Sequence, residues 1–307
     1  MTALLLWAGV LIDLWLGEPR RWHPLVGFGR CTGWLERRLN KGSDFRRRIT
    51  GLVVLLLLVA PPVLICVWLM QWPLLQWLLS PLVLWFTLGF KSLGDHIEPI
   101  RRALKQGDEP EARRRTAMIC SRDEATLEIE RTAVESVLEN GNDAVFGALF
   151  WFCVFGAPGA LAFRLINTLD ASWGYRSERF LYFGWAAARL DDLAGFLPAR
   201  LTALSYALCG QTRRALRCWR LQAPQHDSPN GGPVMAAGAG ALGLQLGGPT
   251  RYRGTLVNKP ILGEGRPAAC EDLDRSLKLL RYSVLFWLVV ISLIQFGWIL
   301  AAGVFHG

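Results

Sequence analysis

Charged residues are scarce in this sequence of 307 residues. Asp, Glu, Lys and Arg make up only 19% of it, whereas 52% is hydrophobic, and the mean hydropathy is +0.26. Soluble globular domains carry about 25% charged residues, so the composition argues against an ordinary soluble domain. Residues 49–90 contain no charge at all. Because a helix needs about 20 apolar residues to span the hydrocarbon core, this run predicts two membrane crossings with a turn at residues 71–73.

Motifs for nucleotides, metals and disulfides are also missing. The seven cysteines include no CxxC pair, so neither a zinc site nor a disulfide framework is predicted. No GxxxxGK[ST] motif occurs, and any use of ATP must therefore follow another route than a Walker loop. Gly238, Gly240 and Gly243 match GxGxxG, but they lie in an Ala- and Gly-rich stretch that no strand pattern precedes. We expect a closely packed helix of small residues there.

Basic residues indicate which parts of the chain face the cytoplasm. All 34 Lys and Arg lie in three polar regions, with nine in residues 17–48, nine in residues 91–143 and sixteen in residues 164–281. The positive-inside rule predicts that all three are cytoplasmic loops of a multi-pass protein of the inner cell membrane. We expect one membrane-embedded, all-α domain over residues 1–307. Its apolar segments are expected at residues 2–17, 50–70, 74–90, 144–163 and 283–305.

One of these segments, residues 144–163, conflicts with a simple crossing. A single crossing there would place the sixteen basic residues that follow it outside the cell. Its middle reads Gly156, Ala157, Pro158, Gly159, which can break a helix, and broken helices at membrane depth are tolerated where they line a protein cavity. We therefore expect a re-entrant hairpin. The alternative is a full crossing with a return through residues 193–209.

The net charge of +9 has two plain sources, membrane topology and anionic lipid, and a polyanionic substrate is a third. Nucleic acid is not expected as a partner. The basic run at residues 37–48 is interpreted as an anchor at the lipid surface, and a homo-oligomer is left open.

Three carboxylates precede the apolar segment of residues 144–163 in the sequence. Glu135, Glu139 and Asp143 are four residues apart, which would place them on one helical face if the helix continues through Gly141. Like charges at that spacing repel each other. Mg²⁺, which binds through one or two carboxylates plus substrate phosphates, would resolve the repulsion. The alternative is a solvated acidic face that Arg131 partly neutralises.

Polar residues also crowd the carboxyl-terminal side of the segment. They are Arg164, Asn167, Asp170, Tyr175, Arg176, Arg189, Asp191, Asp192 and Arg200. The forked donors of arginine suit phosphate or carboxylate groups. Asp191 and Asp192 point in different directions on a helix, so at most one of them is expected to face a common site. The alternative is a set of structural ion pairs at a helical junction.

Two further stretches combine polar residues with Gly and Pro. In HDSPNGGP, Ser228 is predicted to cap a helix with Pro229 at its first position, which leaves Asn230 and free backbone donors for an anion. An ordinary Pro/Gly loop is the alternative there. In GEPRRWHPLVGFGR, His23 lies in a loop beyond the first apolar segment. A lone histidine of this kind is more often structural or solvated than functional.

Several stretches together carry a family resemblance. They are GEPRRWHPLVGFGR, ESVLENGNDAV, RLINTLDASWGYR, FGWAAARLDD, LPARLTAL, SPNGGP and GALGLQLGGPTRYRG. In this order they resemble the CobD/CbiB family of cobalamin biosynthesis, the adenosylcobinamide-phosphate synthases, over nearly the whole chain. The resemblance implies an integral membrane ligase that joins the carboxylate of adenosylcobyric acid, a corrinoid, to aminopropanol or its phosphate with ATP and Mg²⁺.

The resemblance also implies roles for individual residues. Glu135, Glu139 and Asp143 are expected to bind Mg²⁺ with ATP. Asn167, Asp170 and Asn230 are expected to position the acyl group or the amine, and His23 or Asp191 to accept the proton of the amine. Binding of substrate or ATP is expected of Arg122, Asn140, Tyr175, Arg189, Asp192, Arg200 and Asn230. Two other functions stay open: a membrane sensor of the AmpE type, which resembles this family distantly, and a corrinoid-binding scaffold without catalysis.

Overall fold

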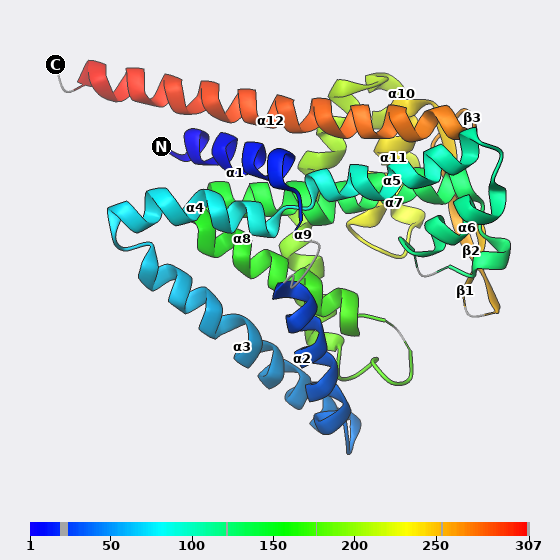
Figure 1. Ribbon diagram of the computed structural model, residues 1–307, viewed down its shortest axis with the longest axis horizontal. Helices are drawn as coiled ribbons and strands as arrows, with labels where there is room; N and C mark the ends of the chain where they lie inside the picture. Colours follow the sequence, from blue (N-terminus) through cyan, green and yellow to red (C-terminus); the bar gives the residue numbers. More distant parts are fainter. Residues whose placement is uncertain (19–23, 121, 176, 253, 306–307) are drawn as a thin grey trace. The chain divides into compact units, whose positions relative to one another are not determined.

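The computed structural model describes residues 1–18, 24–120, 122–175, 177–252 and 254–305 (Figure 1). Helices dominate these residues, which confirms the predicted helical class. The chain divides into two compact units. Unit 1 comprises Met1–Gly89 and Asp143–Gly195, and unit 2 comprises Phe90–Asn142 and Phe196–Gly307. That both belong to one membrane-embedded domain stays a prediction.

Unit 1 is built from helices. They are α1 (Thr2–Leu16), α2 (Pro24–Leu39), α3 (Asp44–Leu69), α4 (Pro73–Thr87), α8 (Gly147–Trp173) and the first part of α9 (Trp185–Cys209). Of these, α1, α3, α4 and α8 are largely apolar. The uncharged run forms α3 and α4, and Pro73 at the start of α4 follows a short turn, as predicted. Ser43 caps α3 by accepting a hydrogen bond from the backbone N–H of Arg46 at 3.4 Å.

The segment predicted to re-enter folds back on itself. Gly156 interrupts α8 with a left-handed φ of 66°, a conformation that glycine adopts without steric cost. A Cβ atom on Gly147 would lie 2.1 Å from the ring of Phe163, and one on Gly159 would lie 2.4 Å from the carbonyl oxygen of Trp151. Residues so far apart in sequence meet only if the two limbs of α8 lie side by side. The hairpin is confirmed, and Figure 1 shows its two limbs.

A buried cluster packs α3 against the carboxyl-terminal limb of α8 and the start of α9. Its members are Val54, Leu55, Leu169, Trp173, Phe183, Ala186 and Ala187. The rings of Trp173 and Phe183 meet edge to face with centroids 5.0 Å apart. Gly51 lets α3 approach closely, because a Cβ atom there would lie 2.0 Å from the carbonyl oxygen of Phe183. This packing holds the polar face of α8 in place.

Unit 2 combines helices with a small sheet that the sequence did not predict. Its helices are α5 (Phe90–Lys105), α6 (Glu109–Ala117), α7 (Ile129–Gly141), the end of α9, α10 (Thr212–Gln222), α11 (Gly231–Leu242) and α12 (Cys270–Phe305). Short helical turns lie at Glu124–Thr126 and Ala223–Gln225, and the π-helical turn Asn142–Phe146 leads from this unit into unit 1. Strand β1 (Leu244–Tyr252) pairs antiparallel with β2 (Thr255–Leu262) and parallel with the short β3 (Arg266–Pro267).

The GxGxxG stretch forms α11, a closely packed helix as predicted. Every residue of α11 after Gly231 is buried. A Cβ atom on Gly238 would lie 2.7 Å from the side chain of Leu138, and one on Gly240 would lie 2.8 Å from the backbone of Ala215. Gly243 ends the helix in the left-handed conformation. The glycines therefore let α11 pack closely against its neighbours α7 and α10.

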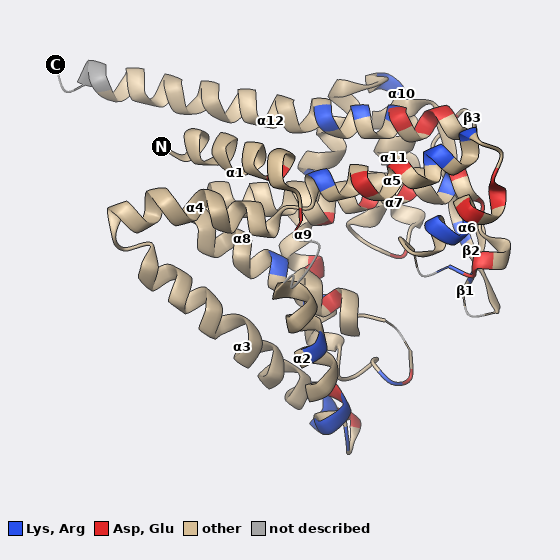
Figure 2. Ribbon diagram, viewed as in Figure 1, with Lys and Arg blue, Asp and Glu red and all other residues tan. Residues whose placement is uncertain are grey.

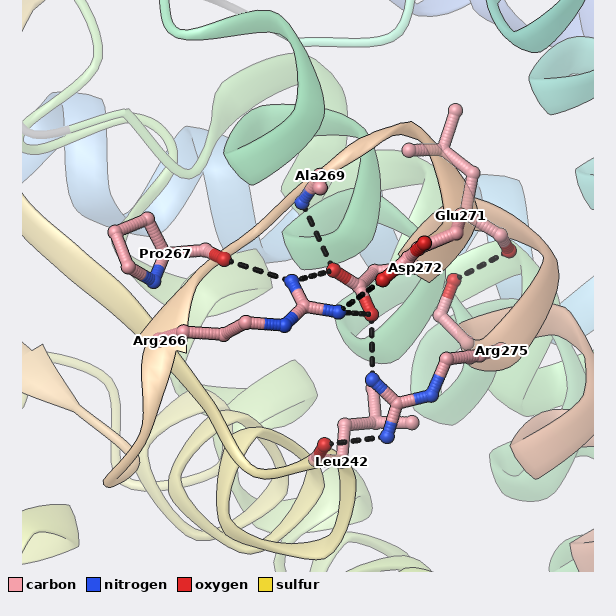
Figure 3. A network of polar contacts seen from close by, with 9 residues as sticks. Leu242, Arg266, Pro267, Ala269, Glu271, Asp272 and Arg275 are labelled. Atoms are coloured by element: carbon pink, nitrogen blue, oxygen red, sulfur yellow. Dashed lines mark hydrogen bonds and ion pairs between the residues drawn. The ribbon is translucent and has the colours of Figure 1, made fainter.

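A buried carboxylate fastens the start of α12 (Figure 3). Asp272, which is fully buried, accepts hydrogen bonds from Arg266 at 2.6 Å and from Arg275 at 2.6 Å. It also accepts one from the backbone N–H of Ala269, at 2.8 Å, and so caps the first turn of the helix. Arg275 in turn donates to the carbonyl oxygen of Leu242, the last residue of α11. The network therefore ties α12 to β3 and to α11.

Within the described part of the chain, four helical segments are long and apolar enough to cross a membrane. They are Asp44–Leu69, Pro73–Lys105, Ile129–Trp173 and Cys270–Ala302. Figure 2 shows that charge is absent from α4 and from most of α3 and α12. The third segment includes the fold-back at Gly156, so its length is not that of one straight crossing. α1 is a shorter apolar helix.

Candidate functional site

The carboxyl-terminal limb of α8 carries a stripe of two charged residues and one amide in unit 1. Arg164, Asn167 and Asp170 recur every three residues, which places them within about 120° of the helix circumference. In an apolar helix such a stripe needs polar partners, because charged and amide groups are costly to bury alone. Elements on either side of α8 supply those partners.

Arg164 is the centre of the first group of partners. Its guanidinium lies 3.8 Å from Glu18 Oε1, and it interacts electrostatically with Glu18, Asp143 and Asp13 in decreasing order. Asp13 is fully buried in α1. Arg164 thus interacts with carboxylates from three other segments of unit 1. Buried ionisable groups that interact in this way are candidates for functional groups.

The approach of Glu18 to Arg164 depends on close packing around Gly89. A Cβ atom on Gly89 would lie 3.3 Å from Glu18 Oε1 and 3.2 Å from the Cβ atom of Ala144. The backbone N–H of Gly89 donates to the carbonyl oxygen of Ala144 at 2.9 Å. Trp85 donates from its ring nitrogen to the carbonyl oxygen of Gly17 at 2.9 Å, which fixes the chain just before Glu18.

The second group lies further along the same limb. Asn167 Nδ2 donates to Asp191 Oδ1 of α9 at 3.2 Å. Asp170 interacts electrostatically with both Asp191 and Asp192. A Cβ atom on Gly174 would lie 1.9 Å from Asp170 Oδ1, so only glycine leaves room for this carboxylate. The structure therefore brings four of the predicted site residues together.

This clustering alters the acidity of Asp191. Burial raises its pKa to about 6, the hydrogen bond from Asn167 opposes the rise, and the charge of Asp192 adds to it. A carboxylate with such a pKa is a better proton acceptor near neutral pH than an ordinary aspartate. Perturbed acids of this kind are candidates for functional groups.

The acidic row is the set of three carboxylates predicted to bind Mg²⁺, Glu135, Glu139 and Asp143. Its first member, Glu135, lies in unit 2 and is bound by other groups of the protein. Glu135 forms a buried ion pair through Oε2 with Arg122, and its Oε1 accepts the backbone N–H of Gly247 at 2.6 Å. Arg122 also donates to Thr132 at 2.9 Å. Both oxygens of Glu135 are thus taken, and the structure does not support Glu135 as a ligand of Mg²⁺. Arg122 correspondingly serves β1 and α7 rather than an open site.

The other members of the row do not share one surrounding. Glu139 is exposed, whereas Glu135 is buried. A π-helical turn, Asn142–Phe146, follows α7, so the four-residue spacing no longer keeps Asp143 on the same face. Asn140 Nδ2 donates to the carbonyl oxygen of Ser136, one turn back, at 2.9 Å. Among the described residues, no group of three or more His, Cys, Asp or Glu side chains is placed to hold a metal ion.

Unit 2 also brings together Arg200 and Asn230, two residues of which substrate or ATP binding was expected. Arg200 Nη1 donates to Asn230 Oδ1 at 2.9 Å, and its guanidinium lies 3.5 Å from the ring centroid of Phe196. A cavity of about 460 Å³ adjoins them, lined by Arg200, Trp219, Arg220, Ala223, Pro224, His226, Asp227, Pro229 and Pro233. His226 Nδ1 accepts the backbone N–H of Ser228 at 3.1 Å.

The predicted cap of α11 is displaced along the chain. The helix begins at Gly231, with Asn230 as its first flanking residue, so Pro229 is not its first helical residue. Ser228 Oγ accepts the N–H groups of Asn230 at 3.3 Å and Gly231 at 2.9 Å. The side chain of Asn230 turns to Arg200 instead of capping the helix. The prediction was therefore correct in the role of Ser228 and wrong in the position of the helix start.

Two of the remaining predicted residues are exposed. Arg189 is exposed on α9, and Tyr175 is 45% exposed after α8. His23 and Arg176 lie outside the described residues. Conversely, the sequence prediction assigned no role to Glu18 and His226, and it named Arg164 only among the arginines suited to phosphate or carboxylate. All three stand in motifs quoted above, and that position was the available signal.

Comparisons with known proteins agree on one family. The family described as CobD/Cbib protein matches residues 6–280. Cobalamin biosynthesis protein CobD of Stutzerimonas stutzeri (strain A1501) is 52% identical over 295 residues, which cover 95% of this chain and 97% of that protein. The protein of the same name from Chromobacterium violaceum is 49% identical over 294 residues, covering 93% and 94%.

A more distant relative is the protein of that name from Mycobacterium tuberculosis (strain H37Rv), 42% identical over 283 residues and 89% of each chain. No solved structure matches the chain. The agreement over nearly the full length of these relatives excludes a match confined to one motif. The chain belongs to the CobD/CbiB family, a family of cobalamin biosynthesis.

Proposed function

We propose that this protein is the membrane amide ligase of the cobalamin pathway that joins adenosylcobyric acid to aminopropanol or aminopropanol phosphate with ATP. Membership of the CobD/CbiB family supports the pathway. The polar stripe of α8 supports catalysis, because buried ionisable groups among membrane helices are rare outside functional sites. The hydrogen bond between Asn167 and Asp191 is the observation on which the proposed chemistry rests.

The reaction needs an activated acyl donor, because a carboxylate does not react with an amine at a useful rate. In the proposed sequence, a carboxylate oxygen of adenosylcobyric acid attacks the γ-phosphorus of ATP and ADP leaves. The amine nitrogen then attacks the acyl carbon of the resulting acyl phosphate, and inorganic phosphate leaves. The amine must lose one proton, so the site needs a base, and positive groups must offset the developing charge.

Asp191 is the proposed base. Its raised pKa, about 6, leaves it ionised at neutral pH yet able to hold a proton. Asn167 orients the carboxylate of Asp191 by donating a hydrogen bond of 3.2 Å to Asp191 Oδ1. The charge of Asp192 beside Asp191 favours the binding of a protonated amine before it reacts. Each of these groups would act from a helix, which fixes its position better than a loop.

Arg164 is proposed to contact the phosphates of ATP, and Asp143 is proposed to bind the Mg²⁺ that accompanies them. Mg²⁺, when bound, would neutralise phosphate charge, and its hard oxygen ligands fit a carboxylate such as Asp143 together with substrate phosphates. Because no larger ligand group is present among the described residues, ATP itself would supply most of the coordination. Arg189, exposed on α9, is available to contact phosphate. The cavity beside Arg200 and Asn230 in unit 2 is proposed to bind a further anionic group.

The proposed orientation places the three basic regions in the cytoplasm, where ATP is available. The hairpin of α8 supports this orientation, because a fold-back returns the chain to the side from which it entered. All Lys and Arg then lie on one side of the membrane, as the positive-inside rule requires.

Turnover by the purified protein tests the proposal. Full-length protein in detergent is supplied with adenosylcobyric acid, MgATP and aminopropanol phosphate, and ADP and the amide are measured. We expect equal amounts of both, with a rate lowered by on the order of 10²-fold in Asp191→Asn, the size of effect typical of a general base. Gln211→Glu, on the surface of unit 2, is a control that should retain the rate. Corrinoid binding without ADP or amide formation would make the protein a scaffold.

A further inference from the structure

Positive charge gathers in unit 1 where α2 ends and α3 begins. We name this region the basic corner; its Lys and Arg residues are Arg37, Arg38, Lys41, Arg46, Arg47, Arg48 and Arg179. Its acidic residues are Glu36, Asp44 and Glu178. Seven cations against three anions leave a formal charge of +4. Figure 2 shows the blue of Lys and Arg at this end of α3.

A depression in the basic corner has a fixed wall. Its volume is about 540 Å³, and it is lined by Glu36, Arg37, Asn40, Arg47, Glu178 and Arg179. Arg47 Nε donates to Asn40 Oδ1 at 2.8 Å, and Arg47 Nη2 donates to the carbonyl oxygen of Arg179 at 2.6 Å. Asn40 Nδ2 donates to Glu36 at 2.8 Å. These bonds join two stretches that are far apart in the chain, residues 36–47 and residues 178–179, around one cationic surface.

Glu36 acts as an internal anchor of this wall. Burial raises the pKa of its carboxyl, but hydrogen bonds from Arg179 and Asn40 outweigh that effect, so the pKa lies below its ordinary value. The side chain is only 4% exposed and is paired with Arg179. It therefore fixes Arg179 in place, while Arg37, Lys41 and Arg46 remain exposed. The exposed cations are not needed to hold the corner together.

Apolar side chains flank the same cations. Phe45 is 76% exposed and Trp34 is 51% exposed, with the guanidinium of Arg38 lying 5.2 Å from the ring of Trp34. Beyond its charged first turn, α3 continues as an uncharged helix that is long enough to cross a membrane. The corner therefore lies at one end of a candidate membrane span, at the depth where headgroups meet acyl chains.

We propose that the basic corner binds the headgroup of an anionic phospholipid, with Arg37, Lys41 and Arg46 contacting the phosphate and Phe45 inserted among the acyl chains. Charge complementarity supports an anionic headgroup, since a zwitterionic one would gain little from a net charge of +4. The exposed aromatic side chains support a lipid over a free phosphate, because a small anion gives Phe45 and Trp34 nothing to bury against. Neither Asn167 nor Asp191 is among the residues that line the depression.

Native mass spectrometry of the full-length protein in detergent tests this site. The protein is titrated with phosphatidylglycerol and, separately, with phosphatidylcholine of the same acyl chains. We expect tighter binding of phosphatidylglycerol. The variant R37Q/K41Q/R46Q should lower its affinity by at least about tenfold, since each cation near an anionic surface contributes about fivefold. The matched control R102Q/K105Q/R213Q removes three exposed cations of unit 2 and should retain the affinity.

A second variant and a competition separate the alternatives. Phe45→Ser should shorten the residence of phosphatidylglycerol while the protein keeps its unfolding temperature, because the side chain is exposed. Inorganic phosphate, compared with chloride at equal ionic strength, should not displace the lipid. The proposal is overturned if both lipids bind equally, if the control triple variant loses as much affinity as the first, or if inorganic phosphate displaces phosphatidylglycerol.

Discussion

The fold-back of α8 leads to a quantitative prediction for Gly147 and Phe163. A Cβ atom on Gly147 would lie 2.1 Å from the ring of Phe163, which is only 3% exposed. The substitution Gly147→Ala must therefore displace a buried ring. Overpacking of a filled core costs about 1–3 kcal/mol, and we expect a loss of about 2 kcal/mol in the free energy of unfolding. Phe163→Leu alone should cost about 1–2 kcal/mol, because it removes part of a buried ring.

The double variant distinguishes the hairpin from a straight helix. If the two limbs touch, the smaller leucine leaves room for the added methyl group, and the double variant should be about 1 kcal/mol more stable than the sum of the single changes predicts. In a straight helix the two positions would be about 24 Å apart, and their effects would add.

Reversible unfolding in bicelles, followed by steric trapping, measures these free energies in a lipid surrounding. Phe183→Leu is the matched control, since Phe183 is also fully buried in unit 1 but is not among the atoms nearest to Gly147. Additivity within about 0.5 kcal/mol for Gly147→Ala with Phe163→Leu would refute the hairpin.

Three other predictions follow from single carboxylates. Glu135→Gln should cost about 3–5 kcal/mol in chemical unfolding, because it leaves Arg122 buried without its counter-charge, and it should leave the Mg²⁺ dependence of ATP turnover unchanged. An altered Mg²⁺ dependence with unchanged stability would make Glu135 a metal ligand instead. Asp191 must be ionised to accept a proton, and its pKa is raised to about 6, so the rate of amide formation should fall as the pH falls below about 6. In Asp191→Asn this limb of the pH profile should vanish from the residual rate, and a limb that persists would assign it to another group. Asp272→Ala should lower stability by about 1–2 kcal/mol through the lost cap of α12, whereas the control Glu271→Ala, at an exposed ion pair, should cost less than about 0.5 kcal/mol in thermal unfolding. Equal losses in the two variants would contradict the role given to Asp272.

The long helices and the hairpin were predictable from the sequence because each follows from one strong local signal. An uncharged run fixes α3 and α4, and Gly156 with Pro158 marks the fold-back. The sheet was not predicted, because β1 has the sequence LQLGGPTRY, in which Gly247 and Gly248 interrupt any alternation of apolar and polar residues. Its register depends on contacts with β2 that no short window contains.

The candidate site was predictable in part. Asn167, Asp170 and Asp191 come together because two helices pack along their polar faces, as the residue types suggested. Asp170 also interacts with Asp192, although the sequence predicted that at most one of the two adjacent aspartates would face a common site. The acidic row failed as a single face because it assumed α-helical spacing through Gly141, where the chain instead makes a π-helical turn. The engagement of Glu135 was hidden from the sequence, since its partners Arg122 and Gly247 are distant from it along the chain.

Transfer of oxygen from the acid substrate tests the central claim most directly. Adenosylcobyric acid labelled with ¹⁸O in the reacting carboxylate is incubated with the purified protein, MgATP and aminopropanol phosphate, and the products are analysed by mass spectrometry. An amide ligase that passes through an acyl phosphate must deliver one ¹⁸O atom to inorganic phosphate for each amide formed. Label in AMP would contradict the acyl phosphate, and neither amide nor labelled phosphate would contradict the ligase itself.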